Sequence, residues 1–347
     1  MRTALLFGLL LFAVAVSALG QTPAPRLTGT FLQLLEEHGS WTDAQWAQLF
    51  DSLKSLGVQD IVVQWSVVGN LAFYPSLEFR TVRNVPLETV LRMADSAQMK
   101  VRVGLISDPA YWSYVQKDPQ QVADYLQGLR DKSLAAAGEL APMLKRHPCV
   151  QGWYISEEID DISWRSREAR SVLFAHVSKL SAELHQLLPK GTVSISAFSQ
   201  AQSSPEGFEQ FWDEFFRRTG VDTVLYQDGV GAGKMDLNDL PVYLEAIRGA
   251  ADKNRRTATV VIELFTQTAG PPIDNSAFKA VPASFNRIGC QLAMAARYSV
   301  NGIVGFSIPD YMTPQGGPAA GKLFSQYQAL ITQGGRWPCE RSQLSLP

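Results

Sequence analysis

Histidine and cysteine are scarce in this sequence of 347 residues, which has four of the former and three of the latter. No histidine follows a predicted strand closely, because His38, His147, His176 and His185 fall in a loop, at helix ends or within helices. There is no His-x-His pair on the first strand and no His-Glu-x-x-His motif, so a zinc hydrolase would lack its ligands. A serine hydrolase would lack its base. We therefore expect neither a metal nor a cofactor.

An excess of charge of either sign is also missing. The sequence has 31 Lys and Arg residues against 33 Asp and Glu, a formal net charge of −2, and the two signs are interspersed. Binding to nucleic acid through a basic surface is therefore excluded. No predicted strand ends in lysine, which excludes an aldolase acting through a Schiff base. These absences leave carboxylates as the groups available for proton transfer and nucleophilic attack.

Long apolar runs are absent except at the N-terminus. Residues 4–19 are apolar after Met1 Arg2 Thr3, and the small residues Ala18 and Gly20 precede Gln21. This pattern predicts a signal peptide over residues 1–20 and a secreted or periplasmic protein. A membrane anchor is the alternative, but about 16 apolar residues fall short of the roughly 20 that span a bilayer. We expect no membrane span after cleavage.

The rest of the chain reads as one domain without a linker. Residues 21–26 form a spacer containing Pro23 and Pro25, residues 27–335 form the predicted domain, and residues 336–347 form a C-terminal tail. A domain of this size suits a (β/α)8 barrel of roughly 250 residues with insertions. We expect it to act as a monomer.

The three cysteines all fall in the exported part and can form at most one disulfide. If the domain is a barrel, Cys149 precedes the fourth strand and Cys339 follows the last helix, so that both lie at the lower face. A Cys149–Cys339 disulfide is therefore one possibility. Cys290, inside a predicted helix, is then expected to be buried and unpaired.

Apolar periodicity alternates between strand and helix eight times. The predicted strands cover residues 27–34, 60–68, 100–106, 150–156, 192–198, 222–227, 258–265 and 302–308. The predicted helices cover residues 42–56, 87–98, 119–146, 164–188, 206–219, 237–253, 282–299 and 321–331. The strands are continuously apolar, as in a parallel sheet covered by helices, and eight of them close a TIM barrel. An open doubly wound sheet is disfavoured because the first strand lacks a glycine-rich phosphate turn.

In such a barrel the active site is built where the strands end. The strand ends here offer polar and aromatic side chains that suit a sugar, because flat rings stack on sugar rings and amides or carboxylates bond hydroxyls. The predicted substrate-binding residues are Gln33, Gln64, Trp65, Asp108, Trp112, Tyr226, Gln227, Asp228, Asp310 and Tyr311, with Tyr111 as a further stacking ring.

Two strands end in glutamate, which predicts the carboxylate pair of a glycosidase. Glu263 stands at the end of the seventh strand, in an otherwise apolar segment, and is the predicted nucleophile; a structural ion pair is its alternative reading. Glu157 and Glu158 end the fourth strand, and only one of them can face inward. Glu158 is favoured as general acid/base because it shares a face with the small residues Gly152 and Ser156.

The expected spacing of the pair allows cooperation. Strands about 4.8 Å apart and tilted by roughly 36° place the fourth and seventh strands about 14 Å apart across the barrel. Two glutamate side chains then leave about 6 Å, between the separations of retaining and inverting pairs. The glutamate that does not face inward, together with Asp160 and Asp161, would place negative charge near the N-terminus of the next helix, where the helix dipole favours carboxylates.

Four segments carry a resemblance to a known family. They are Gly29 Thr30 Phe31 Leu32 Gln33, then Gly152 Trp153 Tyr154 Ile155 with Glu158 Ile159 Asp160, then Tyr226 Gln227 Asp228 Gly229 Val230 Gly231, and Ile262 Glu263 Leu264 Phe265. The chain resembles, over nearly its whole mature length, the bacterial family labelled domain of unknown function 4434.

That family is similar in architecture to the clan A retaining glycosidases, and the resemblance implies an acid/base and a nucleophile on strands four and seven. The clan places Asn before its acid/base, whereas Ser156 or Glu157 stands there in this sequence.

The sequence thus predicts a glycoside hydrolase that acts on a polysaccharide or oligosaccharide through two carboxylates, by retention. The alternative is a non-catalytic carbohydrate-binding or exopolysaccharide-assembly protein on the same barrel. A third reading is a divalent-metal site built from Asp108, Glu158, Asp228 and Asp310.

Overall fold

The computed structural model of the protein describes residues 24–339. The predicted signal peptide and most of the C-terminal tail lie outside the described residues. Within that range, none of the helices combines the length and the apolar character needed to cross a membrane.

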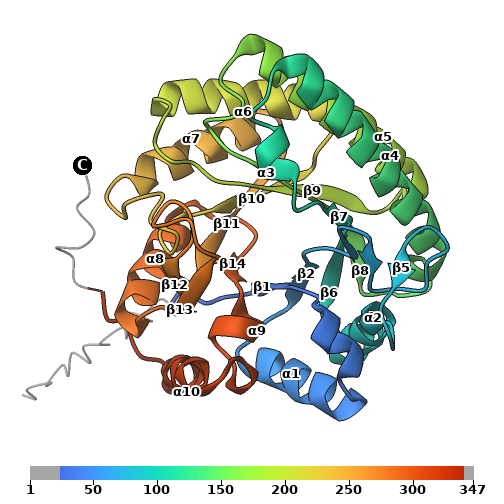
Figure 1. Ribbon diagram of the computed structural model, residues 1–347. Coiled ribbons are helices and arrows are strands. Elements are labelled where there is room, and N and C mark those ends of the chain that lie inside the picture. The colour runs from blue at the N-terminus through green and yellow to red at the C-terminus, as the bar shows by residue number, and fades with distance from the viewer. Residues whose placement is uncertain (1–23, 340–347) are drawn as a thin grey trace, which may run out of the picture.

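A closed barrel of eight parallel strands forms the centre of the molecule (Figure 1). Its strands are, in order around the barrel, β1 (Gly29–Leu32), β2 (Asp60–Val63), β6 (Lys100–Gly104), β8 (Val150–Ile159), β9 (Thr192–Ala197), β10 (Thr223–Gln227), β11 (Thr257–Glu263) and β14 (Ile303–Phe306). Because each strand pairs in parallel with the next and β14 pairs with β1, the barrel sheet itself has no open edge. The predicted TIM barrel is confirmed.

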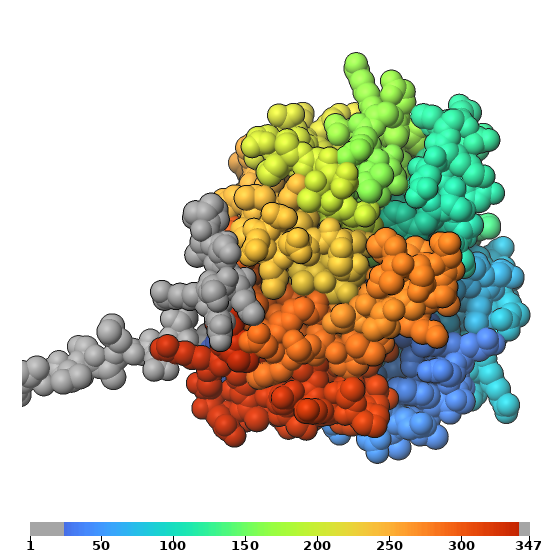
Figure 2. All heavy atoms as spheres, turned by 60° about the vertical axis from the view of Figure 1, so that its left-hand side comes forward, coloured from blue at the N-terminus to red at the C-terminus, as the bar shows by residue number. Residues whose placement is uncertain are grey.

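Eight long helices surround the barrel. They are α1 (Asp43–Ser55), α2 (Pro86–Ala97), α4 (Pro119–Leu144), α5 (Arg167–Leu187), α6 (Pro205–Thr219), α7 (Leu240–Lys253), α8 (Phe285–Tyr298) and α10 (Pro318–Gln333). Figures 1 and 2 show α10 beside α1, so the last helix completes the ring. Local signals fix the helix ends: in α1, Thr42 and Gln45 form a capping box, and Trp46, Leu49 and Leu53 face the core.

Side chains fill the barrel interior in layers. The middle layer is apolar and consists of Phe31, Val62, Tyr154, Leu225, Val261 and Val304. Because side chains alternate along a strand, residues two positions further on point into the upper mouth. These are Gln33, Gln64, Ser156, Gln227, Glu263 and Phe306. The layer below the apolar one is polar and lines a pocket at the amino ends of the strands.

Additional elements follow the strand ends and build the rim of the mouth. The predicted second strand is divided, because β2 ends at Val63 and β3 (Val67–Val68) joins a small sheet with β4 (Leu71–Ala72), β5 (Arg80–Thr81) and β7 (Ile106–Ser107). Short helices α3 (Tyr111–Tyr114) and α9 (Ile308–Tyr311) follow β7 and β14. A hairpin of β12 (Phe265–Ala269) and β13 (Lys279–Pro282) follows β11.

The disulfide differs from the predicted one. Cys290 on α8 is bonded to Cys339, with their Cα atoms 5.0 Å apart, and Cys149 is buried and free. The reason is the path of the chain after α10, which runs back along α8 and packs Trp337 against Phe285 at a ring separation of 5.2 Å. The predicted Cys149–Cys339 pairing and an unpaired Cys290 are therefore wrong.

Candidate active site

Glu263 ends β11 inside the mouth and is 3% exposed. Its Oε2 accepts a hydrogen bond of 2.7 Å from the backbone N–H of Ala232, in the loop after β10. Its Oε1 accepts no hydrogen bond from the described residues and is not among the fully buried atoms without a partner. One carboxylate oxygen is thus held by the backbone while the other is left for a ligand.

The loop over Glu263 requires glycine at position 231. A Cβ atom added to Gly231 would lie 2.7 Å from the Cβ of Glu263, closer than real Cβ contacts allow. The preceding Gly229 has a φ of +67°, in the left-handed region that glycine adopts without strain. These two glycines allow the loop to approach Glu263 closely enough for Ala232 to donate its N–H.

Asp228 anchors the backbone around Glu263. Its Oδ1 accepts hydrogen bonds of 3.2 Å from the backbone N–H groups of Val230 and Glu263. Its Oδ2 accepts a hydrogen bond of 2.5 Å from the side chain of Gln291, which α8 places beneath the barrel mouth. Both oxygens of Asp228 are therefore occupied by hydrogen bonds within the protein, and the residue is 1% exposed, so neither is left for a sugar. Its predicted role as a substrate contact is corrected to one of positioning Glu263.

Burial changes the acidity of this pair of carboxyl groups. Loss of solvent, followed by the charge of Asp228, raises the pKa of Glu263 to about 7, and Lys234 opposes the rise. Burial also raises the pKa of Asp228 to about 6, against the hydrogen bond from Gln291. Glu263 therefore changes its charge near neutral pH, which is a property of groups that act in catalysis.

Glu158 faces the mouth from the end of β8. Its Oε1 accepts a hydrogen bond of 2.6 Å from the side-chain amide of Gln227 on β10. A shift in the β8–β9 register between Ile155 and Glu158 places Glu158 beside Ser196. The bulged strand continues to Ile159, three residues beyond its predicted end.

Glu157 points the other way, toward the helix layer. It is 6% exposed, and its Oε1 lies 3.2 Å from Nε2 of His176 on α5. The structure therefore brings Glu158, and not its neighbour, to the side of the barrel where Glu263 lies.

Two glutamines and an aspartate add polar groups to the mouth. Gln33 donates a 2.7 Å hydrogen bond from Nε2 to Oε1 of Gln64. Asp108 and Gln64 line a pocket of about 200 Å³ together with Trp112 and both Glu157 and Glu158. The predicted residues Gln33, Gln64, Asp108, Trp112 and Gln227 thus lie where a ligand of Glu158 could contact them.

Aromatic rings flank Glu158. Trp112 on α3 is 37% exposed and packs against Tyr111 at 5.2 Å and against Phe198 at 5.7 Å between ring centroids. The Nζ atom of Lys234 lies 3.5 Å from the centroid of Phe198 and forms no ion pair with a described residue. This wall offers one exposed ring face with an ammonium group at its end.

A second aromatic wall leads outward from Glu263. Phe306 contacts Phe265 at 6.1 Å, and Phe265 contacts both Tyr311 at 5.4 Å and Phe278 at 5.6 Å. Phe278 lies in the hairpin between β12 and β13 and is 55% exposed. Each of the two carboxylates thus has a group of aromatic rings near it, and flat rings of this kind can stack on sugars.

Asp310 and Tyr311 lie on α9 beside this second wall. The hydroxyl of Ser307 donates to Asp310, and burial raises the pKa of that carboxyl. Burial, with the charges of Asp310 and Glu263, raises the pKa of Tyr311 to about 12. Both residues lie near the mouth, as predicted from their strand.

One predicted sugar contact lies away from the mouth. Tyr226 is 0% exposed and packs against Phe208 of α6 at 5.8 Å, because alternation along β10 turns it outward while Gln227 turns inward. The prediction of Tyr226 as a substrate contact is corrected. Trp65 is partly buried and donates its indole N–H to the carbonyl of Leu34 at 2.7 Å, and its predicted substrate contact stays a prediction.

Three residues of the site were not predicted. Lys234 and Phe278 lie in loops, where sequence periodicity carries no information on direction. Gln291 was detectable in principle, since it interrupts the apolar face of α8 formed by Ile288 and Leu292.

The third reading, a divalent-metal site, finds no support in the arrangement of the side chains. Between residues 24 and 339 no three His, Cys, Asp or Glu side chains are grouped so that they could hold a metal ion. Asp108, Glu158, Asp228 and Asp310 are thus not assembled as ligands.

Comparisons with known proteins agree with this architecture. Residues 27–317 match the model of the family described as Domain of unknown function (DUF4434). The uncharacterized protein YbcH of Escherichia coli is 32% identical over 231 residues, which are 66% of this chain and 73% of that protein.

Solved structures with the same fold carry glycosidase names. A protein of Bacteroides thetaiotaomicron, described as a candidate α-L-fucosidase, superposes with a TM-score of 0.73 at 20% identity and covers 96% of this chain and 99% of that one. The endo-β-1,4-mannanase of Thermotoga petrophila superposes with a TM-score of 0.60 at 12% identity over 90% of this chain and 78% of that one. At these identities the likeness shows the fold alone.

Proposed function

This chain belongs to the family described as Domain of unknown function (DUF4434), and we propose that it is a glycoside hydrolase that cleaves a polysaccharide or oligosaccharide with retention. Its fold is that of glycosidases. The observation that supports the proposal most is the pair of glutamates, Glu158 and Glu263, at the ends of β8 and β11 on the inner side of one barrel mouth.

The proposed reaction uses one carboxylate as nucleophile and one carboxyl as acid. Glu263 attacks the anomeric carbon while Glu158 gives its proton to the leaving glycosidic oxygen, so that a glycosyl ester forms and the first product leaves. Glu158, now ionised, takes a proton from a water molecule, which attacks the anomeric carbon and releases Glu263. The protons balance over the two steps, and no cofactor is required.

The surrounding residues have matching roles in this proposal. The amide of Gln227 fixes the direction of the Glu158 carboxyl. The N–H of Ala232 and the contacts of Asp228 fix Glu263. Trp112 and Phe278 offer exposed rings for sugar stacking.

The raised pKa of Glu263 makes the assignment of roles testable. A nucleophile must be ionised, so kcat/KM is expected to rise as the pH increases through about 7, where Glu263 loses its proton. If Glu263 were instead the general acid, kcat/KM would fall over the same range. A pH profile on an active substrate therefore distinguishes the two assignments.

The direct test incubates the protein with a panel of bacterial polysaccharides and oligosaccharides and measures hydrolysis as the release of reducing ends. Glu158→Gln and Glu263→Gln are expected to lower kcat by at least about a thousandfold. The matched control is Glu183→Gln, because Glu183 is exposed on α5 and far from the mouth in sequence and structure. Full turnover in both site variants would refute the mechanism.

A second candidate function is carbohydrate binding without turnover. The observation that favours it is the depth of Glu263, which is only 3% exposed beneath the loop containing Gly231. Calorimetry separates the two functions: a polysaccharide that binds wild type with no release of reducing ends supports binding alone.

We also propose that the protein acts outside the cytoplasm after removal of residues 1–20. N-terminal sequencing of the protein recovered from an exporting host tests this, and an intact Met1 in the mature protein would contradict it.

A further inference from the structure

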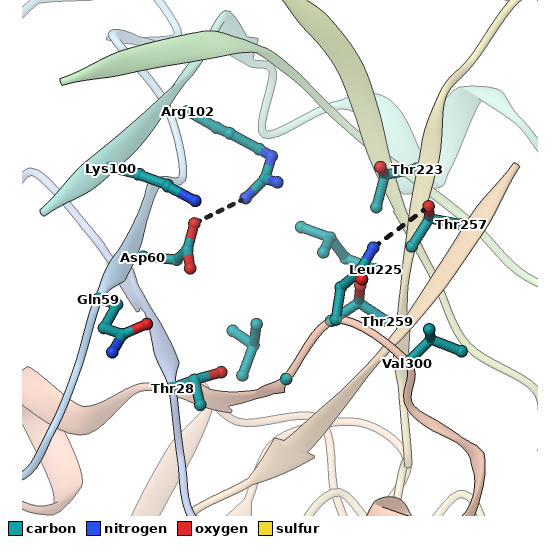
Figure 3. A pocket seen from close by; sticks show the side chains of 13 residues that line it. Thr28, Gln59, Asp60, Lys100, Arg102, Thr223, Leu225, Thr257, Thr259 and Val300 are labelled. Atoms are coloured by element: carbon teal, nitrogen blue, oxygen red, sulfur yellow. Dashed lines mark hydrogen bonds and ion pairs between the residues drawn. The ribbon is translucent and has the colours of Figure 1, made fainter. Parts of the chain in front are cut away.

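A second polar pocket opens at the opposite end of the barrel from Glu158 and Glu263 (Figure 3). It has a volume of about 490 Å³, within the range of small-molecule sites. The residues that line it lie before the strands or within their first three residues: Thr28, Gln59, Asp60, Lys100, Arg102, Thr223, Leu225, Thr257, Thr259, Val300, Asn301, Gly302 and Val304.

Arg102 brings a guanidinium with unused hydrogen-bond donors into this pocket. Its side chain is 21% exposed and points from β6 into the pocket, where its nearest anionic atom is Oδ1 of Asp60 at 3.7 Å (Figure 3). That distance is too long for a hydrogen bond. The guanidinium forms no hydrogen bond with a described residue, and its Nε is fully buried without a partner. A guanidinium has five N–H donors, so this one has capacity for a ligand.

The charges of the pocket leave a net positive balance. Lys100 stands two residues before Arg102 on β6 and has no ion pair with a described residue. Asp60, on the neighbouring strand, is the single carboxylate of the lining and offsets one of the two cations. Burial lowers the pKa of Arg102, and the charge of Asp60 opposes that change. With its side chain 21% exposed, the guanidinium has little solvent around it. An anion would relieve that cost.

Hydroxyl groups occupy the wall opposite the cations. Thr223 stands on β10, and Thr257 and Thr259 stand on β11 (Figure 3). Thr257 accepts a long hydrogen bond of 3.5 Å from the side chain of Asn301. The hydroxyls of Thr223 and Thr259 form no hydrogen bond with a described residue. A hydroxyl can donate to an oxygen atom that the cations hold from the other side.

We propose that this amino-terminal pocket binds a small molecule through an oxyanion, a carboxylate or a phosphate group, held by Arg102 and Lys100 and facing the threonines. The site is separate from the proposed active site, and its ligand needs no reaction there. Because the volume exceeds that of the oxyanion alone, the remainder of the molecule lies against Gln59, Asn301 and the threonine wall.

The test is calorimetric titration of the full chain with inorganic phosphate, sulfate and acetate at constant ionic strength, with glycerol as the uncharged control. Constant ionic strength removes the general effect of salt on surface charges. We expect saturable binding of one anion per chain in the millimolar range, with the phosphate and acetate arms distinguishing a tetrahedral from a planar group. Absence of saturation for every anion up to about 20 mM would overturn the proposal.

Variants that are expected to change the affinity for the anion in opposite directions test whether it binds in this pocket. Arg102→Met and Lys100→Met are each expected to weaken binding by at least about fivefold, because each removes a charged donor. Asp60→Asn is expected to strengthen it, because it removes the repelling carboxylate. The matched control is Arg92→Met, since Arg92 is exposed on α2 and pairs with Asp43 at 2.8 Å.

Circular dichroism establishes that each variant is folded. If Arg102→Met does not fold, Lys100→Met and Asp60→Asn still test the site, because they are expected to change the affinity for the anion in opposite directions. Binding that is equal in wild type and in these two variants would refute the assignment of the site.

Discussion

Replacing Glu263 by glutamine is expected to stabilise the protein above neutral pH while it removes the proposed nucleophile. Glu263 is buried, and its pKa of about 7 lies above its reference value of 4.5. The folded protein therefore holds this proton to a higher pH than the unfolded chain does. The stabilising contribution of the protonated group is complete below pH 4.5 and is lost as the pH rises through about 7.

The size of the effect follows from the shift. A difference of about 2.5 units corresponds to about 3 kcal/mol at a pH well above 7, at 1.36 kcal/mol per unit. Glutamine does not ionise, so the variant escapes this loss. Its stability relative to wild type should increase by about 2.5 kcal/mol between pH 5 and pH 8.5. For a chain of this size, that increase corresponds to about 4 °C in Tm.

The assay is thermal and urea denaturation of wild type and Glu263→Gln between pH 5 and pH 8.5. Glu183→Gln, at an exposed position on α5, controls for the loss of one negative charge. A difference between wild type and Glu263→Gln that stays constant over this pH range would refute the reasoning, whatever its sign. A stabilised but inactive variant would show that the site is maintained at the expense of stability.

Three further perturbations have expected outcomes. Lys234→Met should move the rising limb of the kcat/KM profile to higher pH, because the Lys234 charge lowers the pKa of Glu263; an unmoved limb in the pH profile would contradict this. Phe278→Ala should raise KM about tenfold with little change in kcat, since it removes an exposed stacking ring, and an unchanged KM in steady-state kinetics would exclude the stacking role. Cys339→Ser should lower the free energy of unfolding by up to about 4 kcal/mol, because the Cys290–Cys339 bond closes a loop with a sequence separation of 49. Urea denaturation of the oxidised wild type and of the variant measures this difference. As the control, wild type with the disulfide reduced should lose the same free energy of unfolding.

The barrel could be predicted because its signals are local and repeated. Each predicted strand and helix overlaps an observed one, with boundaries displaced by a few residues, as for the predicted helix 206–219 and α6 (Pro205–Thr219). Helix periodicity and capping act over a few residues, so the sequence carries them directly.

The site residues could be predicted only where the alternation of side chains along a strand shows which of them face the barrel mouth. Parity along a strand favoured Glu158 over Glu157, and the structure has Glu158 turned to Gln227. The same parity, applied to β10, separates Tyr226 from Gln227, and the assignment of both as sugar contacts overlooked it. The disulfide could not be derived, because it depends on how the segment after α10 returns to α8 and not on any local pattern.

Strand β10 links the two proposed catalytic groups through neighbouring residues. Gln227 turns inward and donates to Glu158, whereas Asp228 turns outward and accepts from the backbone N–H of Glu263. Because adjacent side chains of a strand point to opposite faces, one dipeptide reaches both glutamates from different sides of the sheet. A displacement of β10 would therefore disturb the acid/base and the nucleophile together.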